Sequence, residues 1–235
     1  MALRHSPKIV SDGLVFCIDP SNIKSYSGTG NTVVDACRNI GSITKSDGLG
    51  FAGSGSQKYF NYGYGEEDRI EVPNNSVLNY DYANWSYNLW INRTIANQTG
   101  WQQLFIKGIG TERRPGVWFY NNDTTALHIT WRAGGGTTQI SINKTDFDVP
   151  IGEWCNIVIQ ARAGSMMSFL NGVKDTQAIG ISNYGANSKE LYIGSESATY
   201  GAPNMHLGYF SVYNTSLTND QIVENYNALK GRFGL

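Results

Sequence analysis

Three carboxylates lie close together in one short stretch, and no other group of residues has a spacing that fits catalysis. Glu66, Asp68 and Glu71 fall within six residues. Two carboxyl groups about 5 Å apart, one a nucleophile and one a general acid and base, can hydrolyse a glycosidic bond. Here, however, the charged Glu67 and Arg69 lie between them and Gly-Tyr-Gly precedes them. We therefore predict a solvated charge cluster that begins in a loop, and no catalytic residue.

The three cysteines do not form a recognisable site. Cys17, Cys37 and Cys155 are odd in number and widely spaced, so they give neither a disulfide framework nor a zinc pattern. Cys17 and Cys155 lie in apolar, strand-like runs, where a free cysteine is usually buried. We expect these two to be buried thiols and Cys37, in a turn-rich stretch, to be more exposed.

Metal and phosphate sites also lack a clear pattern. The histidines are scattered singly, at His5, His128 and His206. A zinc site needs three or four ligands, so we expect none. The glycine run 134–136 is expected to be a hairpin loop, because a phosphate cradle would need a following helix.

The composition is typical of an all-β chain. Of 235 residues, 27 are Gly, 14 Tyr and 6 Trp, and only 16% are charged. Glycine favours turns, whereas aromatic residues favour strands. The net charge of −1 excludes a protein that coats nucleic acid, which would be basic. No apolar run approaches the ~20 residues of a membrane helix, and the first ten residues lack the apolar core of a secretory signal.

Alternation of apolar and polar residues marks the clearest strand, Trp85–Asn92. Trp85, Tyr87, Leu89 and Ile91 fall on one face, which predicts a buried face. Trp90 interrupts the other face, either as a ligand-stacking aromatic or, as we prefer, beneath a covering element. Further strands are expected at Leu14–Asp19, Arg69–Val72, Gln103–Lys107, Val117–Tyr120, Ala126–Arg132, Thr138–Ile142, Trp154–Ala161, Met166–Leu170, Glu190–Gly194 and Met205–Tyr213. Asn171-Gly172 predicts a hairpin turn. Many short strands with regular turns predict an antiparallel two-sheet sandwich or a barrel.

One helix is expected at 218–230, near the end of the chain. Thr218 and Gln221 form a capping box, and Leu217 with Ile222 forms a hydrophobic staple. The apolar face of the helix should dock on the outside of the sandwich, and Gly231 should end it. We expect residues 1–13 to be a polar arm that contacts another chain, and residues 14–235 to be one domain.

Three stretches resemble the laminin G-like branch of the concanavalin A-like lectin/glucanase superfamily. They are EDRIEVPNNSVLNY–DYANWSYNLWIN (67–92), GEWCNIVIQ–SFLNGV (152–173) and ELYIGSES–MHLGYFSVYNTSLTNDQI (190–222). The resemblance implies a jelly-roll sandwich. Some laminin G-like and lectin domains bind calcium through loop carboxylate, amide and carbonyl oxygens, and the candidates here are Asp19, Asn22, Asp35, Asp123 and Asp146. No spacing selects among them, so calcium and the ligand-binding residues stay unassigned. Glucanases of the superfamily carry their carboxylates as E-x-D-x-x-E on one strand. The stretch from Glu66 to Glu71 matches that spacing, but the laminin G-like register points Glu71 outward on a surface strand.

The two ends of the chain resemble a subgroup found in tailed-phage virion proteins. They are PKIVSDGLVFCIDPSNIKSYSGTGNTVVD near the start and QIVENYNALKGRFGL at the close. This resemblance implies a non-catalytic virion structural protein, such as a decoration, fibre or appendage component. It would sit on the virion surface after assembly in the host cytoplasm, with reduced cysteines.

The partners expected from this resemblance are other virion proteins, further copies of the chain and a host-surface glycan. A homo-oligomer is usual for such components, and a trimer would suit a fibre. Nucleic acid and membrane insertion are not expected. The alternatives are a soluble carbohydrate-binding module, an assembly protein whose loops face other subunits, and, less favoured, a glucanase.

Overall fold

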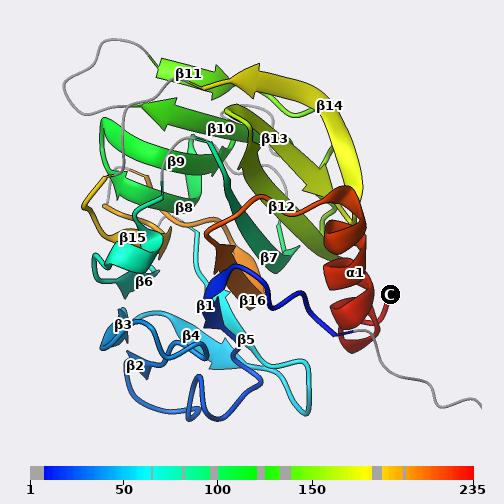
Figure 1. Ribbon diagram of the computed structural model, residues 1–235. Coiled ribbons are helices and arrows are strands. Elements are labelled where there is room, and N and C mark those ends of the chain that lie inside the picture. The colour runs from blue at the N-terminus through cyan, green and yellow to red at the C-terminus, as the bar shows by residue number, and fades with distance from the viewer. Residues whose placement is uncertain are drawn as a thin grey trace, which may run out of the picture.

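Two antiparallel sheets face one another across a hydrophobic core, and one helix lies outside them (Figure 1). The computed structural model describes residues 8–64, 66–80, 83–95, 100–120, 125–132, 139–181, 187–197 and 200–235. Within these residues, no helix has the length and the apolar character needed to cross a membrane. The predicted sandwich is confirmed, with one α-helix near the end of the chain.

Sheet A has eight strands and carries the helix on its outer face. In spatial order its strands are β14 (Val173–Gly180), β13 (Ser165–Leu170), β12 (Trp154–Arg162), β7 (Trp85–Arg93), β16 (Met205–Tyr213), β5 (Tyr59–Tyr62) and β4 (Gly50–Ala52). The eighth strand, β1 (Leu14–Ile18), pairs with the second part of β16, while β5 pairs with its first part. Sheet A thus brings the two ends of the chain together.

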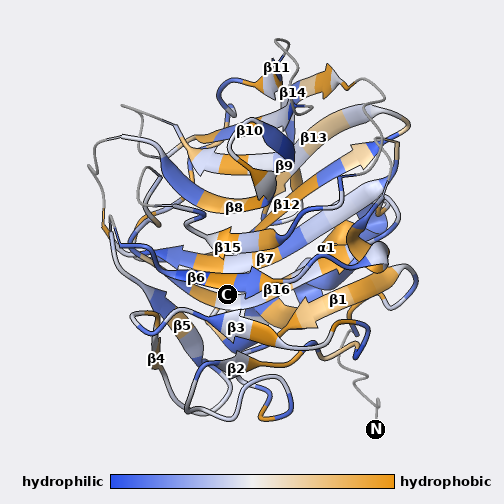
Figure 2. Cartoon of the chain, turned by 90° about the vertical axis from the view of Figure 1, so that its left-hand side faces the viewer, coloured by the Kyte–Doolittle hydropathy of each residue, from blue (hydrophilic) through white to orange (hydrophobic). Residues whose placement is uncertain are grey.

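Sheet B also has eight strands, and its outer face is opposite the helix. In spatial order they are β11 (Gln139–Ile142), β10 (Leu127–Arg132), β9 (Glu112–Phe119), β8 (Gln102–Ile109), β15 (Leu191–Gly194), β6 (Arg69–Val72), β3 (Ile43–Lys45) and β2 (Thr32–Val33). A short 3-10 helix, η1 (Ser76–Leu78), follows β6. In Figure 1 these strands form the left-hand side of the molecule, which faces the viewer in Figure 2.

The core lies between the sheets and follows the alternation of the sequence, seen in Figure 2 as orange and blue segments along the strands. In β7, Trp85, Tyr87, Leu89 and Ile91 are all fully buried in this core, as predicted. Trp85 stacks on Trp131 of the opposite sheet, with ring centroids 5.5 Å apart. Such offset aromatic pairs add to the burial of their apolar surface.

One predicted strand begins earlier than the sequence indicates. We expected it to begin at Val117; Pro115, two residues earlier, lacks the N–H that a central strand needs. The structure extends β9 back to Glu112 across Pro115. Between Gly116 and Arg113 the register shifts by one residue against both neighbouring strands. This bulge is where the ladder lacks regular pairing, so it accommodates the proline.

Helix α1 (Asn219–Leu229) begins as predicted and covers Trp90. Both bonds of the Thr218–Gln221 capping box are present. On the outer face of sheet A, Trp90 stacks against Tyr226 and Phe233, with ring centroids 5.6 and 4.6 Å away. Trp90 is therefore a buried docking residue and not a ligand-stacking aromatic.

The α-helix ends at Leu229, within one residue of the predicted end at 230, but Gly231 does not end it in the left-handed conformation. The chain continues through a 3-10 turn, η2 (Lys230–Phe233), and Gly234 instead adopts the left-handed conformation with φ +82°. The extra turn brings the ring of Phe233 over Gly208, where an added Cβ would lie 2.5 Å from Phe233 Cε1. The helix end is thus set by aromatic packing on the sheet.

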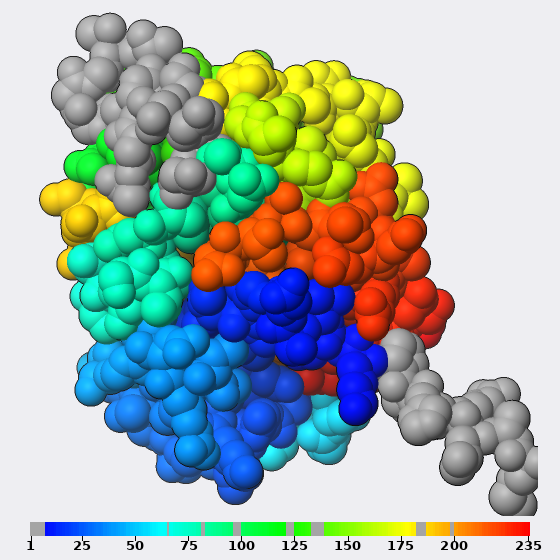
Figure 3. All heavy atoms as spheres, viewed as in Figure 1, coloured from blue at the N-terminus to red at the C-terminus, as the bar shows by residue number. Residues whose placement is uncertain are grey.

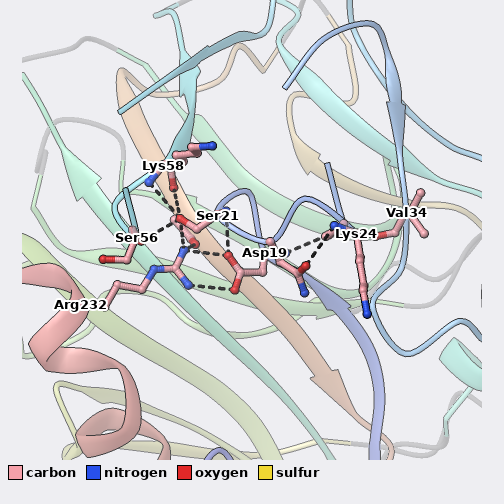
Figure 4. A network of polar contacts seen from close by, with 10 residues as sticks. Asp19, Ser21, Lys24, Val34, Ser56, Lys58 and Arg232 are labelled. Atoms are coloured by element: carbon pink, nitrogen blue, oxygen red, sulfur yellow. Dashed lines mark hydrogen bonds and ion pairs between the residues drawn. The ribbon is translucent and has the colours of Figure 1, made fainter. Parts of the chain in front are cut away.

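A polar clasp joins this C-terminal turn to the N-terminal part of the chain (Figure 4). Arg232 donates to both carboxylate oxygens of Asp19 at 2.9 and 2.8 Å, and also to Ser21 Oγ and the Gly208 carbonyl. Ser21 Oγ in turn accepts a bond from the Lys58 N–H and donates to the Ser56 carbonyl. A bidentate arginine–carboxylate pair of this kind fixes both distance and orientation.

The predicted arm is shorter than residues 1–13. Residues 1–7 lie outside the described part of the chain, but Val10 is buried against α1. The Val10 N–H donates to Asn225 Oδ1 at 2.7 Å and its carbonyl accepts from the Tyr213 hydroxyl at 3.0 Å. In Figure 3 the first described residues, in dark blue, lie against the orange and red C-terminal region. Residues 8–13 belong to the packed domain, so the boundary expected near Gly13 is wrong.

Candidate functional site

The carboxylates considered for catalysis have structural roles. Glu66 and Glu67 are exposed before β6, and Arg69 contacts Glu67 and Glu71 at 3.4 and 3.8 Å. These residues form the predicted solvated charge cluster. Asp68 does not belong to it: the side chain is buried and accepts the Gly63 N–H at 2.8 Å. The prediction of a solvated Asp68 is thus wrong, because this carboxylate supports the turn after β5.

The oxygen ligands considered for calcium hold the protein chain instead. Asp35 is buried and accepts four backbone N–H groups, at 2.9 to 3.2 Å. Asp19 is paired with Arg232, Asn22 accepts the Lys24 N–H, and Asp146 accepts bonds from Thr176 and Gln177. Asp123 and glycines 134–136 lie outside the described residues. Among the residues described, no cluster of three or more His, Cys, Asp and Glu side chains could hold a metal ion.

A lysine ammonium occupies an oxygen cage within sheet B. Lys107 is 1% exposed, and its Nζ donates to Asn79 Oδ1 and the Asn187 carbonyl at 3.2 Å and to the Lys189 carbonyl. Burial lowers the pKa of Lys107 to about 8, although Glu190 and Glu112 oppose that shift. The ammonium is held by neutral oxygens, which partly replace its hydration.

The cysteines are free thiols, and those at Cys17 and Cys155 are buried as predicted. Burial raises the pKa of Cys17 and of Cys37 to about 12 and raises the pKa of Cys155 further. Because the thiolate is the nucleophile, thiols that stay protonated at neutral pH are poor catalysts. His5 lies outside the described residues, and His206 stacks on Tyr59 on the outer face of sheet A.

A pocket of about 190 Å³ opens on the outer face of sheet B, away from the covered face of sheet A. It is lined by Trp101, Arg113, Trp118, His128, Gln139 and Tyr200. A polar cavity holds one water from about 10–15 Å³ of such volume, so this pocket has room for several waters. The pocket therefore suits a single ring-sized ligand or the end of a longer one.

Small side chains on adjacent strands make room for the pocket. Thr130 on β10 lies in register with Gly116 on β9 and with Ser141 on β11. The indole of Trp118 folds back over Gly116, where an added Cβ would lie only 2.2 Å from Trp118 Cη2. Glycine at this position is thus needed for the indole to lie along the strand. Trp118 and His128 alternate with core residues, which places both on the outer face.

Aromatic rings surround the opening of the pocket. Trp101 meets Tyr120 edge-on at 5.2 Å and lies 4.8 Å from the ring of His128. Trp118 lies 6.3 Å from Tyr200. Trp118 is nearly buried, whereas Trp101 and Tyr200 are partly exposed. The pocket thus presents rings at its mouth that a ligand can reach.

A chain of hydrogen bonds fixes the polar groups of the pocket. Arg113 donates to the Gly110 carbonyl at 2.9 Å and to Gln139 Oε1 at 2.7 Å. Gln139 Nε2 lies 3.3 Å from His128 Nε2, and His128 Nδ1 lies 2.9 Å from the Asn143 carbonyl. A carbonyl only accepts, so His128 carries its proton on Nδ1 and accepts from Gln139 at Nε2. Burial lowers the pKa of His128, the Asn143 carbonyl opposes the shift and Arg113 adds to it, which favours the neutral imidazole.

The charged groups near the pocket differ in how completely their polar atoms are hydrogen-bonded. Glu196 is bound by the Gly110 N–H, with oxygens at 2.9 and 3.1 Å. Arg113 stacks over Trp118, with Cζ 4.9 Å from the ring centroid. Three buried polar atoms here, Arg113 Nε, Trp118 Nε1 and Thr130 Oγ1, have no partner among the described residues. Buried polar groups are usually paired, but the Nε1 atoms of the core residues Trp85 and Trp131 are also unpaired among those residues, so these atoms do not by themselves mark a binding site.

Sequence reasoning did not identify this site. It left the ligand-binding residues unassigned, and it treated His128 as an isolated histidine. The lining residues come from β9, β10, β11 and two segments outside the strands. One available signal was that Trp118 and His128 occupy the polar face of alternating strands, as Trp90 does. That signal alone does not separate a docking tryptophan from a ligand-facing one.

Both a family model and solved structures match this chain and identify its fold. A family model described as "Concanavalin A-like lectin/glucanases superfamily" matches residues 64–223. No curated protein matches the chain by sequence.

Solved structures similar to this chain include the binding domains of botulinum neurotoxins. The structure reported for type C, in work on cell entry through two ganglioside molecules, has a TM-score of 0.67, 17% identity, and coverage of 92% of this chain and 51% of that chain. The type DC domain in complex with rat synaptotagmin II has a TM-score of 0.67 and 16% identity, with coverage of 92% of this chain and 52% of that chain. The type DC domain in complex with SialylT has a TM-score of 0.68 and 18% identity, with coverage of 93% of this chain and 52% of that chain. This chain therefore shares the fold and spans about half the length of those domains.

Proposed function

The chain belongs to the concanavalin A-like lectin/glucanase superfamily, and from that membership we propose that it is a non-catalytic glycan-binding domain. The proposed binding site is the pocket on the outer face of sheet B. The single observation that carries the proposal is the convergence of aromatic rings with an oriented set of polar groups at that pocket. Ligand sites typically combine apolar and aromatic walls with a few well-placed polar groups.

Each kind of group in the pocket has a counterpart in a sugar. The apolar C–H faces of a pyranose ring can pack on Trp101 or Tyr200, which are partly exposed. Ring hydroxyls can both donate and accept hydrogen bonds. They could therefore engage the exposed amide of Gln139. This mixture supports a sugar rather than a purely apolar ligand.

A glucanase reaction is not favoured by the pocket. Its mechanism needs two carboxyl groups on either side of the scissile bond. Among the described residues, none of the six that line the pocket is an acid. Asp68, from the one carboxylate cluster with suitable spacing, is committed to the Gly63 N–H. We therefore propose binding without hydrolysis.

The ligands of similar structures add general support. Cell entry of neurotoxin type C is reported to depend on two ganglioside molecules, and the type DC binding domain is reported with SialylT and with synaptotagmin II. Since this chain spans about half of each of those domains and shares at most 18% identity with the three described, those ligands support the class of function and not a particular sugar.

We further propose that the domain belongs to an exposed structural component of a tailed-phage virion. The support is the resemblance of the two chain ends to such proteins. On this proposal the pocket faces a host-surface glycan, and residues 1–7 contact another copy of the chain, as in a trimer, or a neighbouring virion subunit. Labelling the protein on purified particles with an antibody and imaging them by electron microscopy would test the location. Particles without label, from a phage that expresses the protein, would contradict it.

Glycan binding can be tested directly with the purified domain. A glycan array identifies a bound sugar, and titration calorimetry measures its affinity for wild type and Trp101→Ala. Trp101 is partly exposed and outside the core, so its loss should weaken binding without unfolding the domain. Tyr59→Ala is the control, since Tyr59 is also a partly exposed aromatic residue but lies in sheet A. Equal affinities for wild type and Trp101→Ala would place the ligand elsewhere.

A further inference from the structure

The charge of Arg113 is unbalanced within the pocket, and this feature points to the class of ligand. Arg113 is partly buried, yet its hydrogen bonds within the described part of the chain go to neutral oxygens, the Gly110 carbonyl and Gln139 Oε1. Among the described residues, no carboxylate lies within 4.0 Å of its guanidinium, and its buried Nε has no partner. Buried charges in proteins are normally paired.

The charges around Arg113 act in both directions. Burial lowers the pKa of Arg113, and the charge of Arg132, in register with it, lowers that pKa further, whereas Tyr200 and Glu196 raise it. Glu112 contacts Arg114 at 3.7 Å, and Glu196 is bound to the Gly110 N–H. His128 is held neutral by burial and by the bond from Gln139. The pocket therefore has one fixed positive charge among its lining residues and no negative one.

We propose that the pocket binds an acidic sugar, and that the carboxylate of this sugar pairs with Arg113. The inference rests on the proposed glycan-binding function and names the substrate class of that site. A guanidinium matches a carboxylate through two parallel N–H···O bonds, which gives both affinity and orientation. The aromatic rings of the pocket then contact the sugar ring that bears the carboxylate.

Arg113 is preorganised for this role. Its stacking on Trp118 and its bonds to Gly110 and Gln139 hold the guanidinium in one position before ligand arrives. The Gly110 turn is itself fixed by Glu196. Less side-chain freedom is then lost on binding, which favours affinity.

The direct test keeps the protein unchanged and alters only the charge of the ligand. Titration calorimetry compares D-glucuronic acid with its methyl ester and with D-glucose, and N-acetylneuraminic acid with its methyl ester. Since hydrogen bonds to charged groups contribute more than neutral ones, each acid that binds should do so at least ~10-fold more tightly than its ester. The two acids distinguish a uronic acid ligand from a sialic acid. Raising the salt concentration should weaken the acid more than the ester.

Variants identify the residue responsible. Arg113→Gln should bring acid and ester to similar affinity, and Arg113→Lys should restore only part of the preference, because it keeps the charge but loses the planar fork. Arg69→Gln is the matched control: it removes the same charge from the outer face of sheet B but lies outside the pocket. Thermal melts of all three variants confirm that each is folded.

The outcomes separate the two proposals. A preference for acid that is lost in Arg113→Gln and kept in Arg69→Gln supports the inference. Equal binding of acid, ester and neutral sugar, weakened by Trp101→Ala, would overturn the acidic ligand while the glycan-binding function stands. If neither these sugars nor any glycan on an array binds, both proposals fail.

Discussion

The substitution Gly116→Ala tests how the pocket is built. An added Cβ would lie 2.2 and 2.5 Å from Cη2 and Cζ3 of Trp118 and 3.2 Å from Arg113 Cδ. Carbon atoms pack at about 3.5–4.0 Å, so the indole must move by roughly 1.3 Å or more. Trp118 is 3% exposed and lines the pocket, so a displaced ring would move into the space meant for a ligand. Overpacking of this kind typically costs about 1–3 kcal/mol.

The expected result has two parts, stability and ligand binding. For a chain of this length, each kcal/mol lowers Tm by about 2–4 °C, so Gly116→Ala should melt roughly 2–12 °C below wild type. Ligand affinity should fall at least ~10-fold, because the Trp118–Arg113 stack moves with the ring. Calorimetric melting measures the first, and titration with the sugar found on the glycan array measures the second.

A matched control isolates the steric effect. Gly180→Ala makes the same change in a strand, at a position with no heavy atom within 4 Å of the new Cβ. It should be neutral or slightly stabilising, because alanine restricts the unfolded chain. If the two variants melt at the same temperature and bind equally well, the indole does not lie over Gly116, and the described pocket wall is wrong.

Four other predictions concern stability. Thr218→Ala removes the capping box and should cost about 1 kcal/mol in urea unfolding; an unchanged midpoint would show that the cap contributes nothing. Arg232→Lys keeps the charge but loses the two-bond contact with Asp19, so the free energy of unfolding should fall by about 1–2 kcal/mol. No change would show that the clasp is not formed in solution. Lys107 has a pKa of about 8 in the folded state and 10.5 as its ordinary value, so the unfolded state binds more protons between these values. The free energy of unfolding of the wild type should therefore rise relative to that of Lys107→Met by on the order of 3 kcal/mol from pH 8 to 10.5. If the two free energies change in parallel with pH, the burial of the Lys107 ammonium is refuted. Deleting residues 2–8 should leave the melting temperature unchanged, whereas deletion through Val10 should lower it, because two hydrogen bonds and a buried side chain are lost; equal melting of both forms would count against the docking of Val10.

Local patterns in the sequence predicted those elements whose stabilising contacts are also local. The alternation in β7 specifies a buried face whatever strands lie beside it. The Asn171-Gly172 turn has φ values of +50° and +82°, as a two-residue hairpin requires. The capping box of α1 lies within four residues. In each case the interacting groups are neighbours along the chain, so their spacing alone carries the information.

The outward-facing residues of the strands were harder to interpret, because segments far away in the sequence decide whether those residues are covered. Trp90 and Trp118 both interrupt the polar face of a strand. Trp90 is covered by Phe233, 143 residues further along the chain, whereas Trp118 lines the pocket. Asp68 likewise changes from a solvated acid to a buried acceptor because of the turn at Gly63.

The sequence by itself therefore determined the all-β class, the principal strands, the hairpin and the start of the helix. Only the tertiary structure decided where the site lies, how far Val10 and Phe233 extend the domain, and which polar groups are buried. The physical reason is that strand pairing joins β9, β10 and β11 side by side and sets their register. That register places Arg113, Gln139 and His128 within reach of one another, and no spacing along the chain encodes it.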